Sequence, residues 1–144
     1  MHSDLIDSGY VLHEGSNVWM RNGYDSIQYS DGDDFETGLA RALSNVSDLS
    51  VLSDELRRYC VDWPSTYHLS AQRANLLRPL ADTLTGSILE IGAGCGAITR
   101  FLGELGADVL ALEGTARRAE IARLRTHDLD NVTVLAERFG WSAP

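Results

Sequence analysis

The feature that most constrains this chain is the glycine-rich stretch at residues 92–96, which reads Gly-Ala-Gly-Cys-Gly. A short apolar run, 87–91, precedes it and is typical of a buried parallel strand. Apolar residues then return at helical spacing over 98–105, and a second apolar run at 109–112 ends on Glu113. The order strand, glycine turn, helix, strand and acid predicts half of a nucleotide-binding βαβ unit.

Backbone geometry explains why glycine recurs in a turn of this kind. A chain that leaves a strand and enters a helix within a few residues needs backbone angles that a Cβ atom disfavours, and bare backbone lets a ligand approach the helix N-terminus. Glu113 follows the first glycine, Gly92, by 21 residues. A carboxylate in that place can accept two hydrogen bonds from a ribose diol. The spacing is G-x-G-x-G rather than G-x-G-x-x-G, although Ala97 leaves a G-x-G-x-x-G/A interpretation open.

Length and charge narrow the class of protein. A chain of 144 residues is long enough for one domain with a core, or for a small domain with an N-terminal extension. Its net charge of −9 argues against nucleic acid as a bulk partner, because phosphate binding needs a basic face. The sequence contains no lysine, which excludes Walker-A phosphate binding and Schiff-base chemistry.

Other functional classes have weaker support. Cys60 and Cys95 lack a metal-binding spacing, and the Asp-rich tract at 31–34 lacks the remaining ligands of a calcium loop. We therefore predict no metal site. No apolar run is long enough to span a bilayer, and residues 1–10 do not resemble a signal peptide. The prediction is a cytoplasmic protein with no membrane partner.

The rest of the chain adds strands and helices around this unit. Alternating apolar residues between Gly/Asn turns at 10–13, 18–21 and 26–29 predict a small β-meander. The segment 62–70 is interpreted as a connector in which Pro64 stops the preceding helix, with Ser70 as the N-cap of the next one. The predicted helices are 34–43, 54–60, 71–80 and 116–126, and the third core strand is 131–136.

Two groups of side chains have competing interpretations. Arg117, Arg118, Arg123 and Arg125 form a dense basic band that could bind a phosphate, but a solvated face paired with acids such as Glu120 is favoured. A histidine at position 68 has the ordinary pKa of a general base, but a structural hydrogen-bonding role is the preferred interpretation.

Several segments, taken in order, resemble a family. The strings YSDGDDFE, DWPSTYHLSAQRANLLRPL, ILEIGAGCGAITRFLGE, ALEGTARRAEIAR and DLDNVTVL resemble the N-terminal part of bacterial class I S-adenosylmethionine-dependent methyltransferases. The group in question is often associated with, or fused to, glycosyltransferases of surface polysaccharide synthesis. The resemblance extends over about residues 29–139 and implies an α/β, Rossmann-like fold.

The resemblance also implies roles for individual residues, all in binding S-adenosylmethionine or S-adenosylhomocysteine. The glycine turn would lie against the methionine part of the cofactor, the acid after strand two would bind the ribose hydroxyls, and the acid after strand three would bind the adenine amine. A segment before strand one would fold over the cofactor. In this sequence the matching residues are Glu90, Gly92, Ala93, Gly94 and Gly96 for the turn, Glu113 and Gly114 for the ribose, Glu137 for the adenine, and Tyr67 and Arg73 for the covering segment.

The resemblance covers only part of the family's sheet. We expect an N-terminal extension at 1–69 and a partial cofactor-binding domain at 70–144 that is truncated after the third strand, with no assignable catalytic residue. Strand one, 87–91, would then be an apolar edge, and such edges invite pairing. The sequence predicts that a second copy, a partner chain or the chain's own N-terminal β-meander or helices cover this strand, or that the chain is a fragment.

Three functions remain open on the sequence alone. The first is the cofactor-binding portion of a methyltransferase, incomplete for catalysis by itself. The second is a non-enzymatic oligomerisation or interaction module derived from such an enzyme. The third is a fragment of an NAD-dependent oxidoreductase, which would share the βαβ unit but is disfavoured by the glycine spacing and the wider family strings.

Overall fold

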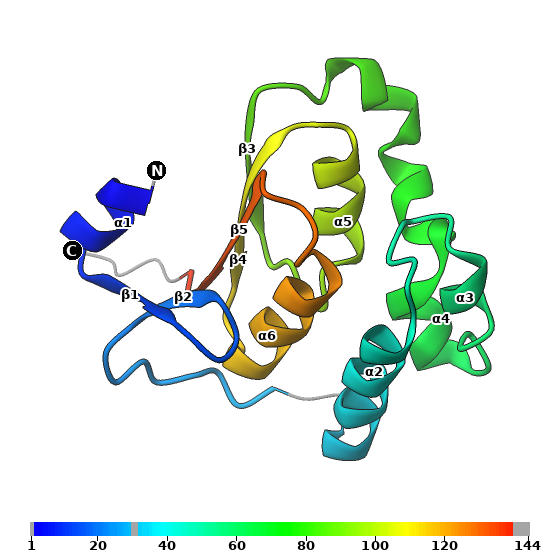
Figure 1. Ribbon diagram of the computed structural model, residues 1–144, viewed down its shortest axis with the longest axis horizontal. Coiled ribbons are helices and arrows are strands. Elements are labelled where there is room, and N and C mark those ends of the chain that lie inside the picture. Colours follow the sequence, from blue (N-terminus) through cyan, green and yellow to red (C-terminus); the bar gives the residue numbers. More distant parts are fainter. Residues whose placement is uncertain (1, 30–31, 140–144) are drawn as a thin grey trace.

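The computed structural model describes residues 2–29 and 32–139, and it contains one mixed β-sheet with helices on both faces (Figure 1). The strands are β1 (Tyr10–His13), β2 (Val18–Arg21), β3 (Ser87–Ile91), β4 (Asp108–Glu113) and β5 (Val132–Ala136). The α-helices are α1 (His2–Asp7), α2 (Asp33–Asn45), α3 (Asp54–Arg57), α4 (Trp63–Leu69), α5 (Ala97–Glu104) and α6 (Ala116–Arg125), and two 3-10 helices are η1 (Ala71–Leu76) and η2 (Arg78–Thr83).

The sheet has the strand order β1-β2-β5-β4-β3. The three core strands are parallel, with Ile88 opposite Val109 and Val109 in turn opposite Val132. Their connections run through α5 and α6, so β3-α5-β4-α6-β5 is a continuous α/β succession. Parallel strands joined by helices, added outward in sequence order, form a Rossmann-like half-sheet.

One face of this half-sheet carries the main core. The helices α5 and α6 cover it, and α2, α3 and α4 lie outside them (Figure 1). Phe101 and Leu102 of α5 are buried against Val109 and Val134 of the sheet, as their helical spacing predicts. A second cluster, which includes Leu39, Leu43, Leu56, Leu69 and Ile121, joins the outer helices to α6. These outer helices bring α4 next to the glycine turn.

The opposite face of the sheet is covered unevenly. Leu5 of α1 is buried against Trp19 and Leu135 at the hairpin end. On β3 at the other end, the side chains of Leu89 and Ile91 are 57% and 50% exposed. The sheet therefore presents a partly apolar surface beside its β3 edge.

The N-terminal strands differ from the sequence prediction. Residues 26–29 form no strand, so the predicted meander is a two-stranded hairpin. The hairpin does not cover strand one: β2 pairs in parallel with β5, with Trp19 opposite Leu135, at the other side of the sheet. Of the alternatives predicted for β3, covering by the N-terminal strands is therefore wrong, and covering by a second copy or a partner chain stays a prediction. A hydrogen bond from the Ile27 backbone amide to the Gly114 carbonyl oxygen, at 3.0 Å, holds the segment after the hairpin instead.

The prediction of a connector at 62–70 is also wrong, because α4 fills this segment. Pro64 lies in the first turn, where its missing N–H costs no intrahelical bond. A capping box starts the helix: the Asp62 carboxylate accepts from the Ser65 amide at 2.8 Å, and the Ser65 hydroxyl oxygen accepts from the Asp62 amide at 3.1 Å.

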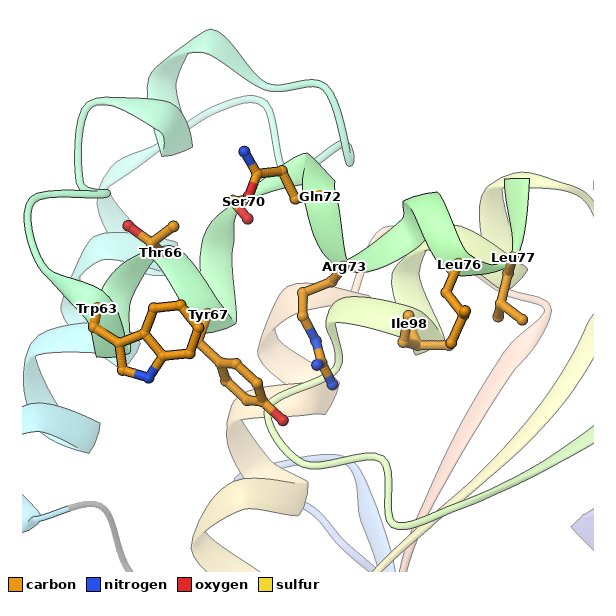
Figure 2. A pocket seen from close by; sticks show the side chains of 9 residues that line it. All are labelled: Trp63, Thr66, Tyr67, Ser70, Gln72, Arg73, Leu76, Leu77 and Ile98. Atoms are coloured by element: carbon orange, nitrogen blue, oxygen red, sulfur yellow. The ribbon is translucent and has the colours of Figure 1, made fainter. Parts of the chain in front are cut away.

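The predicted helix at 71–80 is replaced by η1 and η2. Pro79 disfavours helical angles at the residue before it and supplies no amide, so the run breaks at Leu77 and restarts as a second 3-10 helix. Ser70 precedes η1, but its side chain makes no capping hydrogen bond. The short η1 helix turns Arg73 toward the glycine turn (Figure 2).

The division at residues 69/70 stays a prediction, although β1 and β2 from the first part share the sheet with β3–β5. Asp31, the first residue of the Asp-rich tract at 31–34, lies outside the described residues. Within the described ranges, none of the helices has the length and apolar character needed to cross a membrane.

Candidate functional site

The glycine turn lies between the end of β3 and the start of α5. Gly92, Gly94 and Gly96 have positive φ angles of 78°, 57° and 83°, a backbone region that side chains with a Cβ disfavour. A Cβ added to Gly92 or Gly94 would meet no atom within 4 Å and would project into open space. These two glycines therefore keep clear a hollow next to the N-terminus of α5.

Gly96 differs from the other two. A Cβ at this position would lie 2.8 Å from the Cα atom of Ala122 in α6. Gly96 therefore allows the close approach of α5 and α6, and it does not line either of the two cavities described below. The structure assigns it a packing role, whereas the sequence had grouped it with the cofactor-binding residues.

Glu113 ends β4 directly beside the turn. One of its carboxylate oxygens, Oε2, accepts a hydrogen bond from the Gly94 amide at 2.8 Å. The other, Oε1, accepts from the Thr115 amide at 2.8 Å. The residue is buried. A carboxylate has about four acceptor positions, so these two bonds fix the side chain and leave acceptor capacity for hydroxyl groups.

Glu90 lies under the turn on β3. Its carboxylate accepts a hydrogen bond from the Thr99 hydroxyl at 2.6 Å. Burial is the main cause that raises the pKa of Glu90 to about 7, and the negative charge of Glu113 adds to the increase. The hydrogen bond from Thr99 and the positive charge of Arg73 partly offset it. Two carboxyl groups, those of Glu90 and Glu113, therefore lie beside the glycine turn, and the pKa of Glu90 is near neutral pH.

Two cavities meet at this turn. The first, of about 170 Å³, is lined by Gly92, Ala93 and Gly94 together with Glu90, Tyr67 and Arg73. The second, of about 290 Å³, is lined by Gly114 and Glu137 with apolar side chains such as Leu112. Gly92 and Glu113 line both. Their combined size is in the range of small-molecule sites, and nine of the ten predicted residues border one or the other.

Tyr67 and Arg73 reach the first cavity from α4 and η1. The Arg73 guanidinium carbon lies 4.0 Å from the centre of the Tyr67 ring, and the Trp63 and Tyr67 rings are 6.1 Å apart (Figure 2). Stacking on the ring holds the Arg73 cation near Glu90. The segment before strand one therefore does border the glycine turn, as the resemblance implied.

Glu137 is held by the hairpin. Its Oε2 accepts hydrogen bonds from the Tyr10 hydroxyl at 2.7 Å and from Arg21 Nε at 3.3 Å. Burial raises the pKa of Tyr10, and the hydrogen bond to Glu137 adds to the increase. The acid after strand three thus borders the second cavity, and it also connects the hairpin to β5.

The prediction that the four arginines of α6 form a solvated face is wrong for two of them. Arg118 is buried, with its Nε atom 3.1 Å from Glu36 Oε1 and its guanidinium 4.5 Å from the Tyr29 ring centre. Arg125 is buried and donates to the His68 carbonyl oxygen at 2.6 Å. Both lie at helical spacing from the buried Ala122, and this repeat was the sequence signal for an inward face. Only Arg117 forms the expected exposed pair with Glu120.

Sequence reasoning missed Arg118 as a site residue, and it treated His68 mainly as structural. Both border the first cavity. The His68 ring also contacts the rings of Phe35 and Tyr67, with centroids 5.6 Å and 5.0 Å away. In the described part of the chain, no cluster of three or more His, Cys, Asp or Glu side chains is arranged to hold a metal ion.

The chain resembles known methyltransferases over part of its length. It is 33% identical to the ribosomal RNA small subunit methyltransferase A of Streptococcus pneumoniae strain P1031 over 97 residues, which are 64% of this chain and 33% of that protein. Among solved structures, the DhpI–SAM–HEP complex is 28% identical with a TM-score of 0.42, covering 81% of this chain and 49% of that one. The DhpI–SAH complex is 29% identical with a TM-score of 0.41, covering 72% and 42%.

The chain spans about a third of the length of the curated relatives it matches. No protein-family model matches it. The parallel strands β3, β4 and β5 form a Rossmann-like α/β half-sheet, with the glycine turn after β3 and Glu113 at the end of β4. The fold class predicted from the sequence is confirmed.

Proposed function

We propose that this chain is the S-adenosylmethionine-binding portion of a methyltransferase. The observation that carries the proposal is the position of Glu113, whose carboxylate lies at the junction of the two cavities and is fixed by the Gly94 amide. An acid at the end of the second strand, beside a bare backbone turn, suits a nucleoside whose ribose diol it would bind.

The two cavities suit the two ends of such a ligand. The larger one, with Leu112 and Ile27 on its walls and Glu137 at its border, would take the adenine ring. The smaller one has an exposed Arg73 guanidinium and the Glu90 carboxyl group on its walls. These groups would bind the carboxylate and the ammonium group of the methionine part. When bound, the sulfonium supplies an activated methyl group.

Catalysis by this chain alone is not part of the proposal. Methyl transfer needs an acceptor held in line with the sulfonium, and none of the described residues is assigned as a general base. The association with glycosyltransferases implied by the family resemblance stays a prediction.

Isothermal titration calorimetry with S-adenosylhomocysteine tests the proposal directly. Binding is expected in the wild type. The variant Glu113→Ala should bind about 10- to 100-fold more weakly, because hydrogen bonds to a charged group contribute about 1.5–3 kcal/mol. Glu120→Ala, on the exposed side of α6, is the matched control and should bind normally. NAD in place of S-adenosylhomocysteine should give no binding, since the glycine spacing disfavours an NAD site.

A second function is supported by one observation. The exposed Leu89 and Ile91 beside the β3 edge favour an interaction module that assembles with another copy or with a partner chain. Failure of the wild type to bind S-adenosylhomocysteine, together with a stable oligomer in light scattering at several concentrations, would support this alternative and overturn the first proposal.

A further inference from the structure

A third cavity, of about 500 Å³, lies between α4, η1 and the start of α5 (Figure 2). Its apolar walls are formed by Trp63, Tyr67, Leu76, Leu77 and Ile98. It shares Tyr67, Arg73 and Ile98 with the small cavity at the glycine turn. A molecule in this third cavity would therefore lie next to the methionine end of a bound cofactor.

The walls of this cavity expose unusually large apolar side chains. Trp63 is 76% exposed and Leu76 is 83% exposed, although both are residue types that usually gain free energy from burial. Trp63 and Tyr67 lie one helical turn apart on α4, so their rings stand side by side along the same wall (Figure 2). Adjacent aromatic rings offer stacking surface to a planar ligand.

The polar groups on the walls are few and mostly uncharged. Thr66, Ser70 and Gln72 supply hydroxyl and amide groups, and Arg73 is the only charged residue among the described residues that line the cavity. The proposed function uses that guanidinium for the carboxylate of the cofactor. The remaining wall then suits a ligand without net charge that carries a hydrogen-bonding group at its edge.

We propose that this cavity is the binding site for the methyl acceptor, and that the acceptor is an uncharged, planar aromatic small molecule. This inference rests on the proposed function. In the transfer, a nucleophilic atom of the acceptor forms a bond to the methyl carbon while the carbon–sulfur bond breaks, its electron pair stays on sulfur, and the acceptor's proton passes to solvent.

RNA is the competing acceptor, because an exposed tryptophan can also stack on a base. A strand of RNA carries one negative charge per nucleotide and is bound by several cations. The cavity wall provides Arg73 alone, and the chain has a net charge of −9. The charges therefore favour the small molecule.

The test uses 2-naphthol as a planar, uncharged probe, with its dissociation constant measured by NMR titration of the whole chain. Trp63→Ala is expected to weaken 2-naphthol binding by about fivefold, the effect of losing one aromatic contact. Leu76→Ala should also weaken it. Leu52→Ala is the matched control, because Leu52 is 70% exposed, close to the 83% of Leu76, but lines a different cavity. This variant should bind 2-naphthol like the wild type.

The inference is overturned if Trp63→Ala and Leu76→Ala both bind 2-naphthol like the wild type, or if a ten-nucleotide single-stranded RNA displaces the probe. Calorimetry with S-adenosylhomocysteine on the same proteins separates this proposal from the first one. If Trp63→Ala binds S-adenosylhomocysteine normally but binds 2-naphthol more weakly, the result supports both the cofactor site and the acceptor site. Absence of cofactor binding in the wild type, with naphthol binding still dependent on Trp63, overturns the proposed function and supports the aromatic binding site.

Discussion

The Glu113 carboxylate and the Gly94 amide are 2.8 Å apart, and this hydrogen bond connects the end of the second core strand to the glycine turn. The Thr115 amide binds the other carboxylate oxygen. The acid therefore has a structural task in addition to the ribose contact proposed for it. It holds the turn in the open shape that both cavities need.

This double role predicts a stability effect that does not depend on any ligand. Glu113→Ala should lower the free energy of unfolding by about 2–3 kcal/mol, because two backbone amides lose a charged acceptor in a buried place. Chemical denaturation measures the change, and hydrogen exchange at the Gly94 amide should accelerate. Glu120→Ala is the control and should lower the free energy of unfolding by less than about 1 kcal/mol. An unchanged exchange rate at Gly94 would contradict the assignment.

The raised pKa of Glu90 predicts a pH-dependent stability difference. The folded state holds this proton up to about pH 7, whereas the unfolded chain releases it near 4.5, so the contribution of Glu90 to stability falls as the pH rises through that window. Glu90→Gln removes the charge and keeps an acceptor for Thr99. It should stabilise the protein at pH 8 by about 1–3 kcal/mol and change little at pH 4.

Urea denaturation at both pH values measures this difference. Glu14→Gln, in the exposed turn of the hairpin, is the matched control. It should change the free energy of unfolding by the same small amount at pH 4 and at pH 8. If Glu90→Gln had the same effect on the free energy of unfolding at pH 4 and pH 8, the carboxyl group would not be titrating in this range.

The buried ion pair between Arg118 and Glu36 predicts strong coupling between α2 and α6. Glu36→Ala should lower the free energy of unfolding by about 1.5–3 kcal/mol, because it removes the buried carboxylate that accepts a hydrogen bond from Arg118 Nε. The double variant Glu36→Ala/Arg118→Ala should lose clearly less free energy of unfolding than the sum of the losses in the two single variants. The exposed pair of Arg117 and Glu120 should give a coupling below about 1 kcal/mol in the same double-mutant cycle. Equal coupling in the two cycles would argue against the buried pair.

Gly96 offers a way to separate backbone strain from packing. Gly96→Ala should destabilise the protein by more than Gly106→Ala, since both glycines have a φ of 83° but only Gly96 faces another helix within 4 Å. The strain common to both is about 1–2 kcal/mol. Thermal denaturation of the two variants measures the difference, which reports the contact with Ala122. Similar melting temperatures would mean that α5 and α6 can move apart at little cost.

The core of the fold could be predicted from sequence because its signals are local. The run from Ser87 to Ile91, the glycines after it and the helical repeat through Phe101 each lie within a few residues of one another. The parallel pairing of β2 with β5 could not be predicted in this way. Nothing in Val18–Arg21 distinguishes a free hairpin from one that docks on a distant strand.

The errors near the site have separate causes. Pro64 is compatible with both the end of one helix and the first turn of another, and the capping box of Asp62 and Ser65 decides for the second. Arginine is usually exposed, so the inward face of α6 was missed although Arg118, Ala122 and Arg125 repeat at helical spacing. The cavities themselves depend on how α4 and η1 lie over the turn, which no local pattern encodes.

The pairing of Trp19 with Leu135 has a consequence for how the chain reaches its native state. During synthesis from the N-terminus, the first hairpin leaves the ribosome long before its docking strand has been made. Until then its apolar residues have no permanent neighbour, and closing so large a loop is slow compared with local steps. The hairpin of β1 and β2 is therefore expected to become protected from solvent later than the core strands β3, β4 and β5.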